Sequence, residues 1–130
     1  SMEGSLKLKE ISYIHSESYA AGELKHGTIS LIDEGMPVIA VATQGNLLDK
    51  TLSNVKEVKS RGATVVLVCK EDMDISGCGV DYPVYLPVAR DLLMPLVAVV
   101  PLQLIAYYTA VLKNCDVDHP RNLAKSVTVE

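Results

Sequence analysis

The chain has 130 residues, of which 48% are hydrophobic and 22% charged, and its formal net charge is −4. This length is typical of one domain with a single hydrophobic core. The acidic balance excludes the basic surface that nucleic-acid binding requires, so we expect no nucleic-acid partner.

Cysteine and histidine spacing gives little support for a metal site. Cys69, Cys78 and Cys115 are odd in number, widely spaced and without a CxxC pair, which argues against a disulfide framework or zinc. The three histidines also lack a recognisable metal-ligand spacing. We therefore expect reduced thiols, a cytoplasmic location and no bound metal.

The first third of the chain has a helical pattern. Residues 3–14 place four Leu and Ile side chains among Lys and Glu, which predicts an amphipathic helix. Residues 20–32 combine helix-forming residues with Gly22 and Gly27, which predicts a short, interrupted helix ending near residues 33–35.

Two apolar runs with a helix between them follow. Residues 37–42 form a run without alternation, which is typical of a strand buried on both faces. Residues 47–60 carry apolar side chains three and four apart and predict a helix that ends at Gly62. Residues 64–69 predict a second buried strand. The polar residues 43–46, between strand and helix, give a weak signal for a small anion site.

The last third predicts a turn, a strand and a helix. Residues 70–81 are a polar turn region, and residues 82–86 are a short third strand whose Pro83 favours an edge or a strand start. The apolar stretch 92–112 contains two prolines and Gln103, which favour a buried helix over a membrane span, so we expect no membrane partner. Strands that alternate with helices predict an α/β fold, with a parallel sheet as the central layer of a three-layer αβα sandwich.

A few charged residues are candidates for chemistry. Glu3, Lys7 and Glu10 lie four and three apart, which places two carboxylates around one ammonium on one helix face. Ordinary ion pairing on a solvated face is the commoner explanation. His26 is a candidate because an imidazole is the side chain best suited to moving a proton near neutral pH, although a lone histidine beside a lysine is most often a surface group. Lys125 is a nucleophile when deprotonated, but a solvated tail lysine is the commoner case.

Three separated stretches together match one enzyme family. Residues 3–13 read EGSLKLKEISY, residues 19–27 read YAAGELKHG, and residues 120–130 read PRNLAKSVTVE. In identity, order and approximate spacing they resemble the sugar isomerase (SIS) domain of the glucosamine-6-phosphate synthases, the isomerising glutamine:fructose-6-phosphate aminotransferases. The resemblance covers almost the whole chain.

This resemblance implies a domain division. Residues 3–118 are expected to be part of the second SIS lobe, which is Rossmann-like, and residues 119–130 its catalytic C-terminal tail, with residues 1–2 foreign to the natural sequence. The family's lobe has five strands, one of which precedes the helix at residue 3, so we expect a fold truncated at its N-terminal strand. An open sheet edge invites another strand, and we expect dimerisation or exchange of an element to close it.

The resemblance also implies residue roles in the conversion of fructose 6-phosphate and glutamine to glucosamine 6-phosphate and glutamate. Lys125 is expected to hold the ketose as a Schiff base, and Glu10 to move a proton between C1 and C2. His26 is expected to assist ring opening in the neighbouring subunit. Substrate binding is implied for three further residues: Lys7, Glu3 and the backbone of Ala124.

The expected ligand is therefore a sugar phosphate, the expected assembly is a homodimer, and no metal or organic cofactor is implied. The phosphate-binding loops of the other lobe and the glutaminase are outside the chain, so we expect the chain alone to be inactive. Two alternatives remain: a non-catalytic sugar-phosphate-binding SIS module, and a fragment that serves only oligomerisation. The lysine in the tail and the carboxylate of the first helix favour the enzyme.

Overall fold

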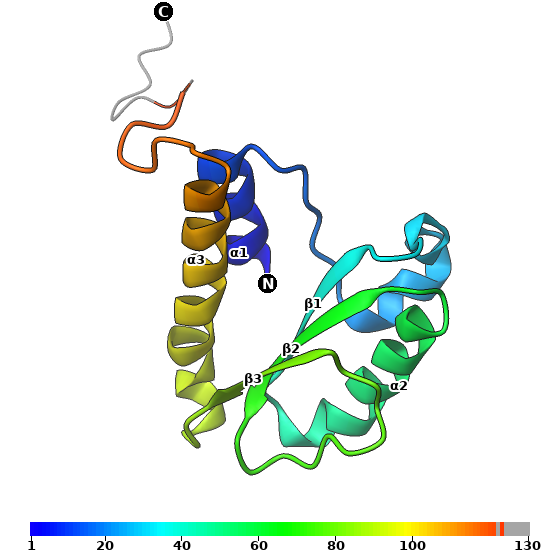
Figure 1. Ribbon diagram of the computed structural model, residues 1–130. Helices are drawn as coiled ribbons and strands as arrows, with labels where there is room; N and C mark the ends of the chain where they lie inside the picture. Colours follow the sequence, from blue (N-terminus) through cyan, green and yellow to red (C-terminus); the bar gives the residue numbers. More distant parts are fainter. Residues whose placement is uncertain (122, 124–130) are drawn as a thin grey trace, which may run out of the picture.

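The structure is built on a parallel sheet with helices on both faces (Figure 1). This computed structural model describes residues 1–121 and 123. The strands are β1 (Pro37–Ala42), β2 (Thr64–Lys70) and β3 (Tyr82–Leu86), in the order β1-β2-β3. Both pairings are parallel. The predicted α/β class, with a parallel sheet inside three layers, is confirmed.

Helix α2 (Leu48–Lys59) covers one face of the sheet and connects β1 to β2. A single 3-10 turn, Gly45–Leu47, precedes it. Val55 and Val58 of this helix are buried against the β2 side chains Val65 and Leu67. Each such side chain contributes about 1.5–3 kcal/mol when it leaves water, which explains why this helix follows its apolar spacing so closely.

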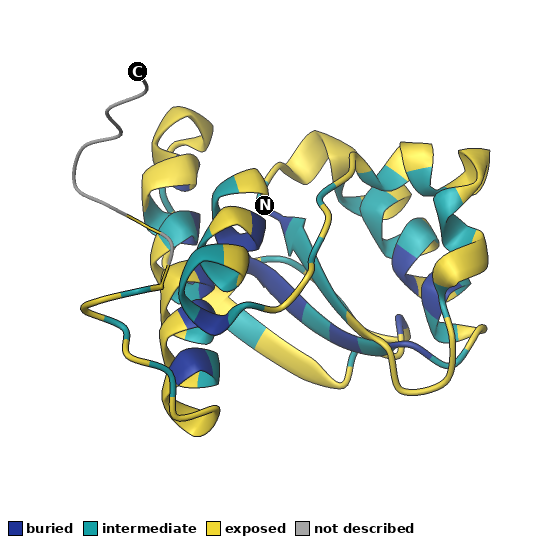
Figure 2. Ribbon diagram, turned by 90° about the horizontal axis from the view of Figure 1, so that it is seen from above, coloured by how far each residue is buried: buried dark blue, intermediate teal, exposed yellow. Residues whose placement is uncertain are grey.

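Helix α3 (Met94–Leu112), which follows the 3-10 turn Asp91–Leu93, covers the other face together with α1 (Met2–Lys7). Its buried residues recur every four positions: Met94, Ala98, Leu102, Ala106 and Ala110. The opposite side is exposed, with Leu96 at 69% (Figure 2). The prediction of a buried helix is therefore correct for one face only.

Residues Asp91–Leu112 are long and apolar enough to cross a membrane, with a mean hydropathy of 1.8, and 22% of their most apolar stretch is buried. The regular buried row, which packs on the sheet at Met94, Ala98 and Leu102, is what a core helix of an α/β domain shows. Pro101 lies inside this helix and removes one backbone donor.

The helix expected over residues 3–14 is shorter and irregular. It consists of α1 and a five-residue π-helical turn, η1 (Leu8–Ser12), and it ends where Tyr13 adopts a left-handed conformation with φ 58°. The helix expected over residues 20–32 is two 3-10 segments, η2 (Ala21–His26) and η3 (Thr28–Leu31). Gly27, with φ 139°, separates them because glycine tolerates that conformation.

Burial of the strands differs from the prediction in one case. β2 is central, and most of its side chains are buried. β1 was expected to be buried on both faces, but it lies at one edge of the described sheet, and only Ala42 among its residues is fully buried. β3, with Pro83, is at the other edge, as its proline predicted.

Candidate functional site

The three charged residues of the N-terminal helix lie together as their spacing predicts. The Lys7 Nζ donates a hydrogen bond to Glu10 Oε2 and is 3.7 Å from Glu3 Oε1. The Glu10 side chain is 26% exposed and that of Lys7 32%, so the group is open to a ligand. The hydrogen bond to Glu10 raises the pKa of Lys7, with Glu3 adding to the effect and burial opposing it. Lys7 is therefore a stable cation rather than a base.

Glu10 is in the middle of the π-helical turn η1, which the sequence did not predict. π-helical turns are rare and often occur at functional sites. Two hydrogen bonds stabilise this one at its end. Ser12 Oγ donates to the carbonyl of Leu8 at 2.6 Å, and Lys113 Nζ, from the end of α3, donates to the carbonyl of Ser12 at 2.7 Å.

His26 is at the last position of η2 and is exposed. η2 packs against α2, on the opposite side of the sheet from η1, which packs against α3 (Figure 1). The described part of the chain therefore does not bring His26 to Glu10. A catalytic His26 would need to act with a second subunit, as the resemblance implies.

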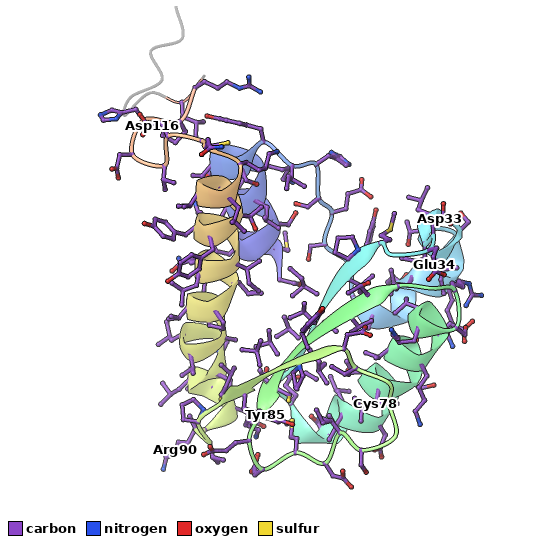
Figure 3. All side chains as sticks on the ribbon, viewed as in Figure 1. Asp33, Glu34, Cys78, Tyr85, Arg90 and Asp116 are labelled. Atoms are coloured by element: carbon purple, nitrogen blue, oxygen red, sulfur yellow. The ribbon has the colours of Figure 1, made fainter. Side chains whose placement is uncertain are left out.

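Lys125 and Ala124 are outside the described residues. The segment that leads toward them begins at the end of α3, where Asp116 Oδ1 accepts backbone N–H bonds from Asp118 and His119, each at 3.0 Å. The bond from His119 is the main reason that the pKa of Asp116 is lowered. Asp116 lies at the opposite end of α3 from Arg90 (Figure 3).

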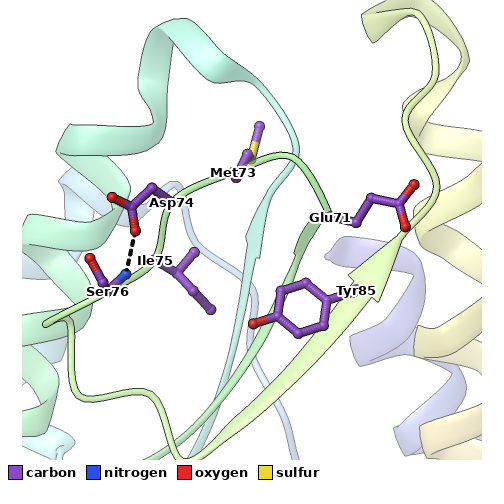
Figure 4. Close-up of a pocket in the computed structure, with 6 residues that line it drawn as sticks. All are labelled: Glu71, Met73, Asp74, Ile75, Ser76 and Tyr85. Carbon is purple, nitrogen blue, oxygen red and sulfur yellow. Dashed lines mark hydrogen bonds between the residues drawn. The ribbon is translucent and has the colours of Figure 1, made fainter.

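A first cavity, of about 520 Å³, lies beside the loop that follows β2 (Figure 4). Its lining includes Glu71, Asp74 and Tyr85. Asp74 Oδ1 accepts the backbone N–H of Ser76 at 2.9 Å, and this bond lowers the pKa of Asp74. Two carboxylates in one lining disfavour a phosphate ligand by charge repulsion.

A second cavity, of about 660 Å³, lies between α1, α3 and the start of β1. Its lining is mainly apolar and includes Ile14, Val38 and Leu102. Neither Glu10 nor His26 lines either of the two cavities. Glu10 is therefore a partly exposed residue of η1 that lies outside both of these cavities.

Two further points concern residues 43–46 and a possible metal site. Residues 43–46 lie at the carboxyl end of β1 and lead through a 3-10 turn into α2, where the weak signal placed them, and their anion binding stays a prediction. Among residues 1–121 and 123, no three His, Cys, Asp or Glu side chains gather as metal ligands.

Comparison with known proteins identifies the family. Residues 1–113 match the SIS domain. The chain belongs to the SIS domain family. The resemblance of the three stretches to this family is thus confirmed, and the parallel sheet agrees with it.

Curated relatives of this SIS domain chain carry one name, "Glutamine--fructose-6-phosphate aminotransferase [isomerizing]". The protein of Caldanaerobacter subterraneus is 62% identical over 130 residues, and the match covers 99% of this chain and 21% of that protein. The protein of Sphingobium yanoikuyae is 57% identical, and the match covers 83% of it. The chain spans about a fifth of the length of most of these relatives.

Solved SIS domain structures agree with the fold. The C-terminal domain of glucosamine-fructose-6-phosphate aminotransferase from Francisella tularensis matches with a TM-score of 0.80 and 43% identity, over 89% of this chain and 33% of that one. A glucosamine-6-phosphate deaminase from Thermotoga maritima matches with a TM-score of 0.79 and 31% identity, over 99% of this chain and 36% of that one.

Proposed function

We propose that this SIS domain chain is the C-terminal part of the isomerase region of a glutamine–fructose-6-phosphate aminotransferase. The complete enzyme would convert fructose 6-phosphate and glutamine to glucosamine 6-phosphate and glutamate. The observation that carries this proposal is the 62% identity to a relative of that name along the whole chain. The chain alone, which is a fifth of that relative, is expected to be inactive.

In the proposed mechanism Glu10 moves the proton. The Lys125 amine condenses with the C2 carbonyl of the open-chain ketose and water leaves. Ammonia then adds at C2 and displaces the Lys125 amine, which gives an imine. Glu10 then removes a proton from C1 and returns it to C2, which converts the imine to the amino aldose. The partly exposed position of Glu10 on η1, where the Lys7 Nζ donates a hydrogen bond to its carboxylate, supports this role because the carboxylate is both held in place and within reach of a ligand.

The other proposed roles follow the matched stretches. Lys125 holds the ketose as a Schiff base before ammonia replaces it, and the Ala124 backbone contacts the sugar. Lys7 and Glu3 bind sugar hydroxyls from the exposed side of α1. His26 opens the sugar ring in the partner of a homodimer, which accounts for its distance from Glu10 in one chain. A cytoplasmic location belongs to the same proposal.

A second candidate is a glucosamine-6-phosphate deaminase, which the match to the Thermotoga maritima structure favours. That match is 31% identical, whereas the aminotransferase relatives reach 62%. The two functions differ in their need for glutamine: a deaminase releases ammonia from glucosamine 6-phosphate without it. A non-catalytic SIS module is not favoured, because the relatives carry an enzyme name over the entire chain.

The decisive experiment substitutes Glu10→Gln in a full-length enzyme that contains this chain. Loss of a positioned acid–base group costs about 10²–10⁴-fold in rate, so we expect glucosamine 6-phosphate formation to fall by that factor. Glutamine hydrolysis should continue, because Glu10 has no role in it. Both products are measured in the same assay.

The matched control is Glu57→Gln, which removes the carboxylate that pairs with Arg61 at the end of α2. Helix α2 lies on the opposite face of the sheet from η1. This variant should keep both activities. Unchanged product formation in Glu10→Gln would refute the role of Glu10.

A further inference from the structure

Segments far apart in the chain meet where the π-helical turn η1 ends. Lys113, directly after α3, donates its Nζ to the carbonyl of Ser12 at 2.7 Å. Arg121 donates its backbone N–H to the hydroxyl of Tyr13 at 2.8 Å, and its guanidinium lies 4.1 Å from the centre of the Tyr13 ring. Residues 12 and 13 are thus both held by the chain that follows α3.

Ser12 is the residue that connects these contacts to the rest of η1. It is fully buried, with 0% of its surface exposed. The last carbonyl groups of a helix have no partner inside the helix, and a buried carbonyl group needs another donor. The Lys113 ammonium is that donor. The Ser12 hydroxyl donates in turn to the carbonyl of Leu8 at 2.6 Å, which connects the last residue of η1 to its first.

The direction of the Glu10 side chain depends on the π-helical form of this turn. Hydrogen bonds in a π-helix reach one residue further than those in an α-helix, so the two forms direct the side chains of the same segment differently. Glu10 is the middle residue of η1. Since π-helical turns are rare, contacts from outside the helix are needed to maintain one. The bond from Lys113 to Ser12 is such a contact.

We infer that Lys113 and Ser12 are positioning residues, which maintain the π-helical turn and thereby direct the Glu10 carboxylate toward the sugar. This inference rests on the proposed function, in which Glu10 moves a proton of the substrate. Ser12 is buried and the Lys113 Nζ is bonded to it, so both act through Glu10 rather than on the sugar. A base must lie within hydrogen-bond reach of the proton that it removes. A misplacement of about 1 Å costs up to about 10²-fold in rate.

The test uses Lys113→Met, which removes the donor and keeps a long side chain, and Lys113→Arg, which keeps a cationic donor. The first readout is amide hydrogen exchange of residues 8–13 in the 130-residue chain, followed by mass spectrometry. Exchange requires local opening, and a hydrogen bond from a charged donor opposes opening by about tenfold. Exchange should therefore accelerate about tenfold in Lys113→Met and much less in Lys113→Arg. This readout does not depend on any enzyme activity.

The second readout is catalysis by the full-length enzyme carrying the same changes. We expect kcat for glucosamine 6-phosphate formation to fall about 10- to 100-fold in Lys113→Met. The KM for fructose 6-phosphate and the rate of glutamine hydrolysis should change little, because the contact binds neither substrate. Lys113→Arg should retain most of the activity. The matched control is Lys56→Met, at an exposed position of α2, which should change neither readout.

A double variant distinguishes positioning of Glu10 from general support of the fold. If Lys113 acts through Glu10, Lys113→Met should cost no further activity in an enzyme that already carries Glu10→Gln. An equal loss in both backgrounds would overturn the positioning role.

The remaining outcomes separate this inference from the proposed function. Unchanged exchange of residues 8–13 in Lys113→Met would show that Lys113 does not maintain the turn, and faster exchange with unchanged kcat would overturn the positioning of Glu10. If the unaltered full-length enzyme forms no glucosamine 6-phosphate, the proposed function fails and the positioning role with it, whereas exchange still decides whether Lys113 maintains the turn. If Lys113→Met does not fold, Ser12→Ala, which removes the hydroxyl bond to Leu8, decides by the same two readouts.

Discussion

At the residue scale, Asp81 shows how one carboxylate attaches a loop to the sheet. Its Oδ2 accepts the backbone N–H of Val65 and the Lys59 Nζ, each at 2.7 Å. Lys59 also donates to the carbonyl of Ala63 at 3.0 Å. These contacts connect the end of α2, the start of β2 and the end of the 71–81 loop directly before β3, and no strand pattern in the sequence reveals them.

The hydrogen bond from Lys59, followed by that from Val65, lowers the pKa of Asp81 below its ordinary value of 3.8. A carboxyl with a lowered folded-state pKa stabilises the fold above its unfolded-state pKa, and this contribution is lost as the pH falls through the folded-state value. Asp81→Asn should therefore lower the free energy of unfolding at pH 7. The difference from the unaltered protein should shrink below pH 3.8.

Urea unfolding at a series of pH values measures this prediction. Asp72→Asn is the matched control, because Asp72 is exposed in the same loop. It should leave the unfolding curves at neutral pH unchanged. An Asp81→Asn difference that stays constant down to the lowest pH would show that packing, rather than the charge, accounts for the effect.

At the element scale, α1 is close to α3 because Gly4 has no side chain. A Cβ built on Gly4 would be 3.0 Å from the Cβ of Leu102, which is tighter than ordinary contact. Gly4→Val should therefore push α1 away from α3 and lower the free energy of unfolding by about 1–3 kcal/mol. In the full-length enzyme it should also reduce product formation, since Lys7 and Glu10 move with α1.

The matched control is Gly22→Val in η2, where an added Cβ meets no atom within 4 Å. That change should stay within about 0.5 kcal/mol in the same unfolding measurement. Equal destabilisation by both substitutions would mean that the general preference for glycine, and not the contact with Leu102, decides the cost at position 4.

The three strands and α2 could be predicted from the sequence because local signals determine them. Each strand is an apolar run that ends at glycine, proline or polar residues, and α2 has a regular apolar spacing. The π-helical turn could not be predicted, because Lys113 stabilises it from 101 residues away. The partial exposure of β1 was missed for a related reason: an apolar run does not reveal how completely other elements cover the two faces of the strand.

The candidate site also has a part that the sequence could predict and a part that it could not. Glu3, Lys7 and Glu10 could be placed together because helical spacing fixes their common face. Tyr13 and its contact with Arg121 carried no recognisable sequence signal, because 108 residues separate the partners. Long-range contacts of this kind follow from the packing of α1 on α3, which only the tertiary structure shows.

At the scale of the whole molecule, the exposed side of α3 is an apolar surface. Leu96, Val100, Leu104 and Val111 form a row along it, with exposures from 46% to 69%. Exposed apolar rows of this kind mark interfaces in soluble proteins. We therefore expect the chain to self-associate through α3, which is one way to form the proposed homodimer.

Light scattering at increasing concentration tests this expectation, because a mass that rises with concentration shows self-association. Leu104→Glu places a charge in the middle of the row and should shift the protein toward the monomer, since an ionised carboxylate buried without a partner is strongly unfavourable. Ser53→Glu adds the same charge on α2 and should leave the mass unchanged.

If Leu104→Glu associates as the unaltered chain does, the interface is elsewhere, with the open edge of β1 the next candidate. A single monomeric mass for the unaltered chain at all concentrations would contradict self-association itself, and the apolar row of α3 would then have to be covered by the remainder of the full-length polypeptide.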